Sequence, residues 1–302
     1  MIFTAFIGLL FIVPIIQGKI TTRQIGALNS LSYSLYFEND KQIISPFHDI
    51  PLFANDQKTL FNMIIEIPKW TNAKNEINKE TQFNPIKQDT SNQEPRFIPN
   101  IFPYKGYIWN YGAFPQTWED PSFISPFTGR KGDNDPIDVI EIGQSIGSVG
   151  EIRQVKILGI IGLIDQDETD WKVVVIDHND PVSNNLTDIE DVEKFMPGYL
   201  NATNNLFKIY KIPEGNPENT IAFDEQAQNK TFATSIVLET HEHWQRLING
   251  TTPRKEIQTI NTSVKGSIYK VKPNDDAVKK VPKARPEPPA SIDPSKTIWY
   301  FV

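Results

Sequence analysis

Three aspartates crowd one short segment of the chain, which reads GDNDPIDV at residues 132–139. Asp133 and Asp135 lie two positions apart, so in an extended segment both side chains would point the same way. Asp138 follows after Pro136 and heads the next expected strand. Such a segment is either a solvated turn, in which aspartates bond to the nearby backbone, or the site of something strongly positive, because converging carboxylates repel one another without a cation.

The type of ligand in this segment favours a hard divalent cation. Oxygen ligands suit magnesium or manganese better than zinc or copper. An EF-hand calcium loop is excluded, because its fifth, sixth and twelfth positions, which need an oxygen ligand, glycine and glutamate, hold Ile137, Asp138 and Gln144. His241 and His243 do not offer a second metal site, because residues two apart on a helix point nearly opposite ways. We expect both histidines at the surface.

Further charged and phenolic residues could complete a site for a small polyanion. The turn IDQDETDWK (164–172) puts Asp165 at the end of one expected strand and Asp170 and Lys172 at the start of the next. At the rim of a closed sheet, these residues could meet the aspartate segment. Taken singly, each remaining candidate is more commonly a surface cation or an amphipathic core tyrosine. Together with metal carboxylates they describe a polyanion site, and they are Lys74, Glu76, Arg96, Tyr107, Tyr111, Tyr210 and Lys211.

Short strands between turn signals predict a β-rich fold, either a barrel or a sandwich. We expect a strand in 60–70 that Pro68 ends, another at 137–143, and a hairpin of 155–165 with 171–177. Thr187 and Glu190 have the spacing of a capping box for a helix that Pro197 and Gly198 stop. A second helix is expected over 233–250.

Composition limits the class of protein. The 302 residues carry a formal net charge of -7 and no cysteine. The acidic balance argues against nucleic-acid binding, and the lack of cysteine removes disulfides and thiolate chemistry. We expect one domain over 19–250 and a Pro/Lys-rich extension over 251–302, whose apolar end IWYFV either docks on the domain or adds a strand.

The first eighteen residues predict a secretory signal peptide. They form an apolar run too short for a membrane span, with Gly18 at a cleavage position. The lack of a basic residue before Lys19 and the large Ile16 speak against this interpretation, and a buried strand is the alternative. No membrane span is then expected in the mature chain. Five sequons would permit glycosylation of a secreted protein, at Asn185, Asn201, Asn229, Asn249 and Asn261.

Residues 31–250 resemble the soluble family I inorganic pyrophosphatases, in particular their fungal and animal branch. The resemblance rests on GDNDPIDV and on the stretches around it, which are FHDIPL (47–52), NMIIEIPKWTNAK (62–74), FPYKGYIWNYGAFPQTWEDP (102–121), ETDWKVVVID (168–177), IEDVEKF (189–195) and GNPEN (215–219). It implies a five-stranded OB-like closed barrel with flanking helices and terminal extensions, usually in a homodimer. The implied activity is hydrolysis of pyrophosphate to two phosphates with several magnesium ions, while manganese is also possible.

The resemblance also implies a role for each candidate residue. Asp135 would deprotonate the attacking water, and Tyr107 would lie near the nucleophile and the electrophile. Tyr111 would sit at the site and Glu66 would line the cavity. The implied metal ligands are Asp133, Asp138 and Asp170, joined by Asp165 and Glu76 for metals that arrive with the substrate. The implied phosphate ligands are Lys74, Arg96, Lys172, Tyr210 and Lys211.

Two features depart from the family pattern. Asp167 stands where the family commonly has glycine, and aspartate tolerates the positive φ of a tight turn better than most residues. The apparent signal peptide predicts a secreted or lumenal protein, whereas most relatives are cytoplasmic. Calcium, which is abundant outside cells, would then inhibit by occupying the oxygen sites with looser geometry. The alternative is a secreted pyrophosphate- or calcium-binding protein without turnover; a structural glycoprotein would leave the convergent charges unexplained.

Overall fold

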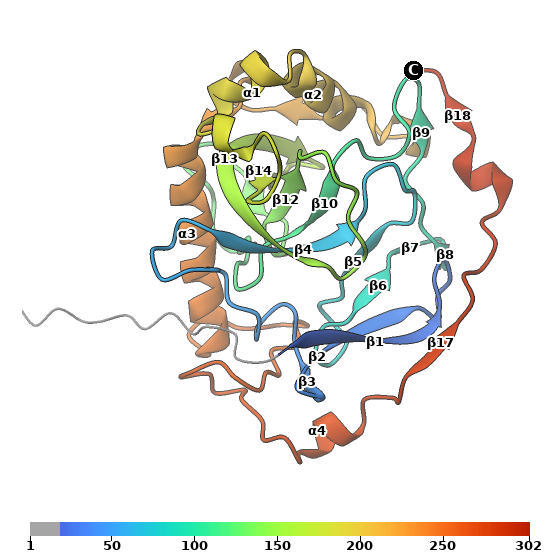
Figure 1. Ribbon diagram of the computed structural model, residues 1–302, viewed down its shortest axis with the longest axis vertical. Coiled ribbons are helices and arrows are strands. Elements are labelled where there is room, and N and C mark those ends of the chain that lie inside the picture. Colours follow the sequence, from blue (N-terminus) through green and yellow to red (C-terminus); the bar gives the residue numbers. More distant parts are fainter. Residues whose placement is uncertain (1–18) are drawn as a thin grey trace, which may run out of the picture.

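Five strands form a ring of hydrogen-bonded pairs in the computed structural model, which describes residues 19–302 (Figure 1). Pairing runs from β14 through β12, β10 and β4 to β13, and β13 pairs with β14 again. The strands are β4 (Phe61–Ile67), β10 (Asn110–Ala113), β12 (Asp138–Glu141), β13 (Ile152–Asp165) and β14 (Glu168–Asp177). The ring and its flanking helices confirm the expected mainly-β class and the β13–β14 hairpin.

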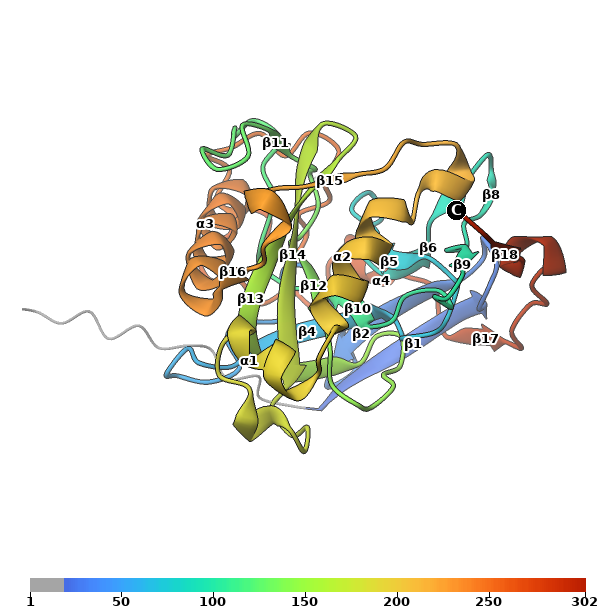
Figure 2. The same cartoon turned by 90° about the horizontal axis from the view of Figure 1, so that it is seen from above.

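Alternating burial explains why these sequences form the ring. Along β14, Val173 and Val175 belong to one apolar cluster, while Val174 and Ile176 belong to another. Side chains on a strand alternate between its two faces, so β14 contributes to both clusters. One cluster packs on α3 (Lys230–Ile248), and the other packs on α1 (Ile189–Phe195) and α2 (Tyr199–Ile209). Figure 2 shows the three helices outside the strands.

The approach of β10 to β4 requires a glycine. A Cβ at Gly112 would lie 1.9 Å from the carbonyl oxygen of Ile64, well inside contact distance. The pairing register shifts beside this residue, between Tyr111 and Gly112. A bulge of this kind bends a strand, and the bend lets the short β10 join its two neighbours in the ring.

A second sheet lies beside the ring and receives the C-terminal extension. It contains β1 (Ile20–Ala27), β2 (Ser34–Asn39), β3 (Gln42–Ile44), β5 (Asn75–Ile77), β6 (Ile86–Gln88) and, from the extension, β17 (Arg285–Glu287). Farther on, β18 (Trp299–Tyr300) pairs in parallel with β9 (Asn100–Ile101). The end of the chain therefore adds a strand, which was one of the two expectations for IWYFV. The extension runs along the outside of the molecule in Figure 1.

The remaining elements are short. They are the strands β7 (Thr90–Ser91), β8 (Glu94–Pro95), β11 (Lys131–Gly132), β15 (Thr220–Ile221) and β16 (Gln228–Asn229), the helix α4 (Asp276–Lys279), and 3-10 turns at Ser183–Asn185, Ile212–Glu214, Phe223–Glu225 and Pro294–Thr297. Over residues 19–302, no helix combines the length and apolar character that crossing a membrane requires. The predicted signal peptide lies outside the described residues.

Helix boundaries differ from the predictions for local reasons. The capping box of α1 is formed by Asp188 and Asp191, so the predicted pair Thr187 and Glu190 was wrong by one residue. Gly198, expected to stop a helix, has a φ of 80° and precedes α2, which was not predicted. Helix α3 begins before residue 233, because Asn229 accepts a hydrogen bond from the backbone N–H of Phe232.

The surface placement predicted for His241 and His243 was also wrong. His243 is only 2% exposed and packs against Phe123. His241 is partly buried, and its Nδ1 is 2.6 Å from the carbonyl oxygen of Gln116. Both histidines are covered because the chain around 116–123 crosses α3, an arrangement that helical periodicity does not reveal.

Candidate functional site

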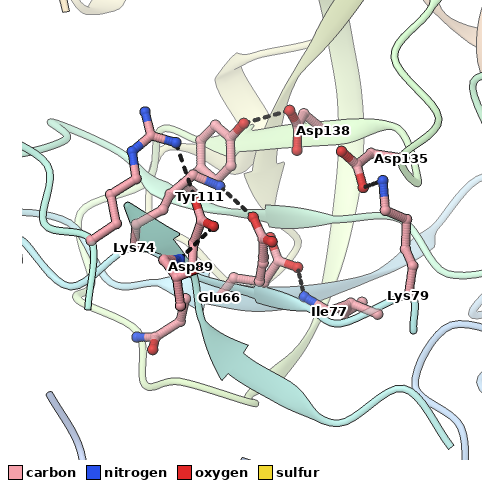
Figure 3. A network of polar contacts seen from close by, with 12 residues as sticks. Glu66, Lys74, Ile77, Lys79, Asp89, Tyr111, Asp135 and Asp138 are labelled. Carbon is pink, nitrogen blue, oxygen red and sulfur yellow. Dashed lines mark hydrogen bonds and ion pairs between the residues drawn. The ribbon is translucent and has the colours of Figure 1, made fainter. Parts of the chain in front are cut away.

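Thirteen of the fourteen predicted site residues come together around one cavity of about 300 Å³. Sixteen residues form the wall of this cavity, and twelve of them are charged. Among the predicted residues, Glu66 is the exception. It is buried outside the wall, and its Oε1 accepts a hydrogen bond of 2.6 Å from the N–H of Ile77 (Figure 3). The wall is formed by Lys74, Glu76, Asp89, Arg96, Tyr107, Tyr111, Asp133, Asp135, Asp138, Asp165, Gln166, Glu168, Asp170, Lys172, Tyr210 and Lys211.

The rim of the ring positions the centre of this cavity. Strand β12 begins at Asp138, which lies opposite Lys172 in the parallel pairing with β14. The Nζ of Lys172 forms ion pairs with both Asp138 and Asp170, and the residue is only 2% exposed. The hydroxyl of Tyr111 donates to the same Asp138 carboxylate (Figure 3). The expected meeting of the hairpin with the aspartate segment is confirmed.

The aspartate segment itself is a turn rather than the extended chain that we expected. Asn134 has a φ of 72°. The N–H of Asp135 donates to Asp133 Oδ1 at 2.9 Å, as in the solvated-turn interpretation of these residues. Two backbone hydrogen bonds join the turn to Glu119. The N–H of Asn134 donates to the carbonyl oxygen of Glu119 at 3.0 Å, and the N–H of Glu119 donates to the carbonyl oxygen of Asp135 at 2.9 Å. The carboxylates of Asp133 and Asp135 nevertheless both reach the cavity.

Cations on the opposite wall are held by their own acidic partners. The Nζ of Lys74 lies 3.0 Å from a carboxylate oxygen of Glu76, two residues farther along the chain. Arg96 bonds to Asp89 at 3.0 Å and to Glu214 at 3.1 Å. Figure 3 shows Lys74 and Asp89 side by side at this wall.

Asp165, the last residue of β13, links the first hairpin strand to the segment after α2. Its carboxylate accepts a hydrogen bond of 2.6 Å from the hydroxyl of Tyr210 and pairs with Lys211. Burial is the main cause that raises the pKa of Tyr210, followed by neighbouring Tyr107 and Asp165. Burial likewise raises the pKa of Tyr107 and Tyr111. All three phenols therefore stay protonated and can donate hydrogen bonds at neutral pH.

The cavity carries more negative than positive charge. Eight carboxylates face four cationic side chains, an excess of four formal negative charges. Burial raises the pKa of Asp133 well above its usual value, and nearby Asp135, Asp170 and Asp138 raise it further. Burial also raises the pKa of Asp170 to about 7, although Lys172 acts in the opposite direction. A wall of this kind needs added cations before it can accept an anion.

Glu119 was missed by the sequence analysis and strengthens the case for a metal. Its carboxylate and those of Asp133 and Asp170 offer ligand atoms within 4.8 Å of one another, close enough to hold one ion. Glu119 is 3% exposed, its Oε1 accepts from Trp171 N–H, and its buried Oε2 has no hydrogen-bond partner. Asp165 Oδ1 is unpartnered in the same way. Such oxygens fit a hard divalent cation, because burying a polar atom without a partner costs free energy.

The hairpin turn accommodates Asp167 as expected. Gln166 and Asp167 have φ values of 49° and 67°, which lie in the left-handed region. Asp167 points outward and pairs with Arg130, and Asp167 is not among the residues of the cavity wall. The extra charge is thus partly neutralised at the surface.

A larger hollow of about 840 Å³ lies between the second sheet, α3 and the C-terminal extension. It is lined by a mixture of apolar and polar residues, among them Ile20, Trp244 and Val264. The charged side chains on its wall are few compared with the smaller cavity, so size alone does not identify the candidate site.

Comparison with known proteins gives a consistent result. Residues 63–245 match the family model described as inorganic pyrophosphatase. The chain is 52% identical over 285 residues to an inorganic pyrophosphatase of Neurospora crassa, covering 94% of this chain and 98% of the relative. It is also 52% identical over 288 residues to that of Schizosaccharomyces pombe, covering 95% and 98%.

Solved structures agree. The structure of inorganic pyrophosphatase from Schistosoma japonicum superposes with a TM-score of 0.88 at 48% identity, covering 93% of this chain and 100% of that one. An N-terminally truncated vacuolar soluble pyrophosphatase of Trypanosoma cruzi, solved in complex with PPi, gives a TM-score of 0.72 at 42% identity, covering 82% and 98%.

The raised pKa of Asp170 predicts how the stability of the metal-free chain depends on pH. The folded state binds more protons than the unfolded state between the usual pKa of 3.8 and about 7, so this carboxyl stabilises the fold at low pH and loses that contribution as pH rises through the interval. We therefore expect the free energy of unfolding of Asp170→Asn to rise relative to that of the parent as the pH increases from 5 to 7.5. The rise is at most about 1.4 kcal/mol per pH unit. Urea denaturation in the presence of a chelator measures this difference. Asp56→Asn, an exposed aspartate outside the cavity, serves as the control, and a difference that does not change with pH would contradict the prediction.

Proposed function

Because the chain belongs to the soluble inorganic pyrophosphatase family of eukaryotic type, we propose that it hydrolyses inorganic pyrophosphate to two orthophosphates in the charged cavity. One observation carries the assignment of the site. Within a family named for this reaction, the residues of the aspartate turn, the β13–β14 hairpin and the Lys74–Arg96 wall enclose one small cavity.

Four cations and three phenols give the cavity its affinity for phosphate. Lys74, Arg96, Lys172 and Lys211 would bind phosphate oxygens, with Tyr210 donating from its hydroxyl. Each cation now faces a carboxylate, so binding a phosphate would exchange one anionic partner for another. The pyrophosphate-bound structure of the Trypanosoma cruzi relative supports this choice of substrate.

The acidic half of the cavity would hold magnesium, with manganese as a possible substitute. The proposed ligands are Asp133, Asp138 and Asp170, with Asp165 and Glu76 for ions that enter with pyrophosphate, and the unpartnered oxygens of Glu119 and Asp165 support such binding. Bound magnesium supplies Lewis acidity, which neutralises phosphate charge and acidifies a water molecule. Calcium would occupy the same oxygens in looser geometry and inhibit.

Asp135 would act as the proton acceptor in the reaction. Water attacks one phosphorus atom, its proton passes to the Asp135 carboxylate, and the bond from that phosphorus to the bridging oxygen breaks. The bridging oxygen leaves with the second phosphate, whose charge the cationic wall stabilises. Tyr107 is buried beside Tyr111 and Tyr210, with ring centroids 4.9 and 6.3 Å away, and would orient the reacting groups through its hydroxyl.

The test is phosphate release from pyrophosphate by the purified chain, with magnesium and then with calcium. We expect magnesium-dependent release that Asp135→Asn lowers at least about 100-fold, since the variant keeps the shape but cannot accept the proton. Added calcium should reduce the rate, and the Asp56→Asn control should match the parent. Tight binding of pyrophosphate without release by the parent would instead favour the binding-protein alternative.

We also propose that the chain forms a homodimer through the end of its C-terminal extension. Pairing of β18 with β9 gathers aromatic rings at the surface, where Phe102 stacks on Phe301 and meets Trp299 edge-on. Phe102 is 62% exposed and Phe301 is 78% exposed. Exposed clusters of aromatic side chains are common at protein interfaces, and a second copy of the chain would bury this one.

Sedimentation velocity tests the dimer. We expect a particle of about twice the chain mass of 34.4 kDa, which Phe301→Ser combined with Trp299→Ser shifts toward the monomer because the apolar contact is lost. Phe195→Ser removes a half-exposed aromatic residue from α1 and should leave the dimer unchanged. A monomeric parent, or a double variant that remains dimeric, would contradict the proposed interface.

We further propose that the chain works in the secretory lumen or outside the cell. The apolar run and Gly18 of the first eighteen residues support entry into the pathway. The sequon residues Asn185, Asn201, Asn229 and Asn249 are exposed, so attached glycans would project into solvent. Asn261 is fully buried, and its Nδ2 donates to Thr259 and Ser267.

Expression of the whole chain in cultured eukaryotic cells tests this location. We expect product in the medium that lacks the first residues and loses mass on treatment with N-glycosidase, with no glycan at Asn261 because the folded chain encloses that amide. N-terminal sequencing and glycopeptide mass spectrometry provide the readouts. An uncleaved chain retained in the cytoplasm would contradict the proposal.

A further inference from the structure

Asp135 forms an ion pair with a lysine that the cavity wall does not include. The Nζ of Lys79 lies 2.6 Å from Asp135 Oδ1 (Figure 3) and donates to the carbonyl oxygen of Asn134 at 3.0 Å. One ammonium group therefore holds both the side chain of the proposed proton acceptor and the backbone of the turn that carries it. Lys79 lies two residues after the end of β5 at Ile77.

The backbone of Lys79 is itself fixed by a buried polar network. Its carbonyl oxygen accepts a hydrogen bond of 2.7 Å from the N–H of Gln258, in the C-terminal extension. The carbonyl of Gln258 is bonded in turn to His48 Nε2 at 2.9 Å and to Asn84 Nδ2 at 3.0 Å. Both His48 and Asn84 are fully buried. The backbone from which the Lys79 side chain extends to the turn is therefore held in place by buried hydrogen bonds.

The other side of the turn is held by its contacts with residues 118–119. Trp118 Nε1 donates to Asn134 Oδ1 at 3.1 Å, and Glu119 makes the two backbone bonds described above. These contacts fix Asn134 and the backbone, but none of them reaches the carboxylate of Asp135. Lys79 supplies a contact to that carboxylate. Because Lys79 lies outside the cavity wall, we expect it to keep its ion pair with Asp135 when phosphate binds to the cations of the wall.

We infer that Lys79 is a positioning residue that orients the Asp135 carboxylate toward the attacking water. The inference rests on the proposed function, because it assigns Asp135 the role of proton acceptor. Reacting groups must be held close to their productive geometry, and a displacement of about 1 Å can cost about 100-fold in rate. Loss of Lys79 should therefore lower kcat and leave the phosphate-binding wall intact.

Steady-state kinetics of three variants test the inference at saturating magnesium. Lys79→Met should lower kcat by about 10- to 100-fold and change the KM for pyrophosphate by less than about 3-fold. Lys79→Arg should recover most of the loss, because it restores a cation within reach of Asp135. Lys194→Met is the matched control, since Lys194 pairs with Asp191 at 2.9 Å on the surface of α1, and it should keep the parent kcat.

A signal that does not depend on activity separates positioning from general destabilisation. The indole N–H of Trp118 bonds to Asn134, so its nuclear magnetic resonance in the metal-free chain reports the turn. We expect this resonance to shift in Lys79→Met and in Lys79→Gln, which serves if the methionine variant does not fold, and to stay in place in Lys194→Met.

An unchanged kcat in Lys79→Met, a raised KM alone, or failure of a folded Lys79→Arg to recover activity would overturn the inference. These outcomes are interpreted with a parent chain that releases phosphate and an Asp135→Asn variant that does not. Inactivity of the parent would count against the proposed function, whereas full activity of Lys79→Met beside an inactive Asp135→Asn would count against Lys79 alone.

Discussion

The buried ion pairs of Lys172 are the constraint around which the site is built. One ammonium group lies between Asp138 at the start of β12 and Asp170 at the start of β14. Without it, two carboxylates from parallel neighbouring strands would face each other in a region of low dielectric constant. A buried pair of this type contributes less to net stability than its Coulomb energy indicates, because both partners lose hydration. Its role here is geometric, because one ammonium group keeps the two proposed metal ligands Asp138 and Asp170 close together.

Contacts from several other parts of the molecule help to hold the charged residues of the cavity in position. The ring supplies rigid strand ends, and the bulge at Gly112 lets β10 bring Tyr111 to the carboxylate of Asp138. The turn at residues 133–135 is braced by Glu119 on one side and Lys79 on the other. The C-terminal extension completes the network behind Lys79 through Gln258. Residues far from the cavity in sequence are therefore part of what keeps its charges in place.

Much of the fold and the site could be predicted from local sequence. The hairpin of β13 and β14 follows from two apolar, β-branched runs around a polar turn, and Asp165, Asp170 and Lys172 were placed at its rim. Local sequence was less informative where the outcome depends on residues distant in the chain or where one residue fits two local structures. Helix α2 was not predicted, because Gly198 equally suits the end of one helix and the start of the next. The burial of His243 depends on a segment more than a hundred residues away.

Residue types and spacing by themselves determined the chemistry of this protein: oxygen ligands for a hard cation, cations and phenols for a polyanion, and no thiol. Those properties belong to single side chains and to short strands and turns, which local physics largely decides. Only the tertiary structure decided that Glu119 joins Asp133 and Asp170, that Glu66 stays outside the cavity wall, and that Lys79 holds Asp135. Such pairings depend on ring closure and on strand register, which bring distant residues together and which no local pattern of residues encodes.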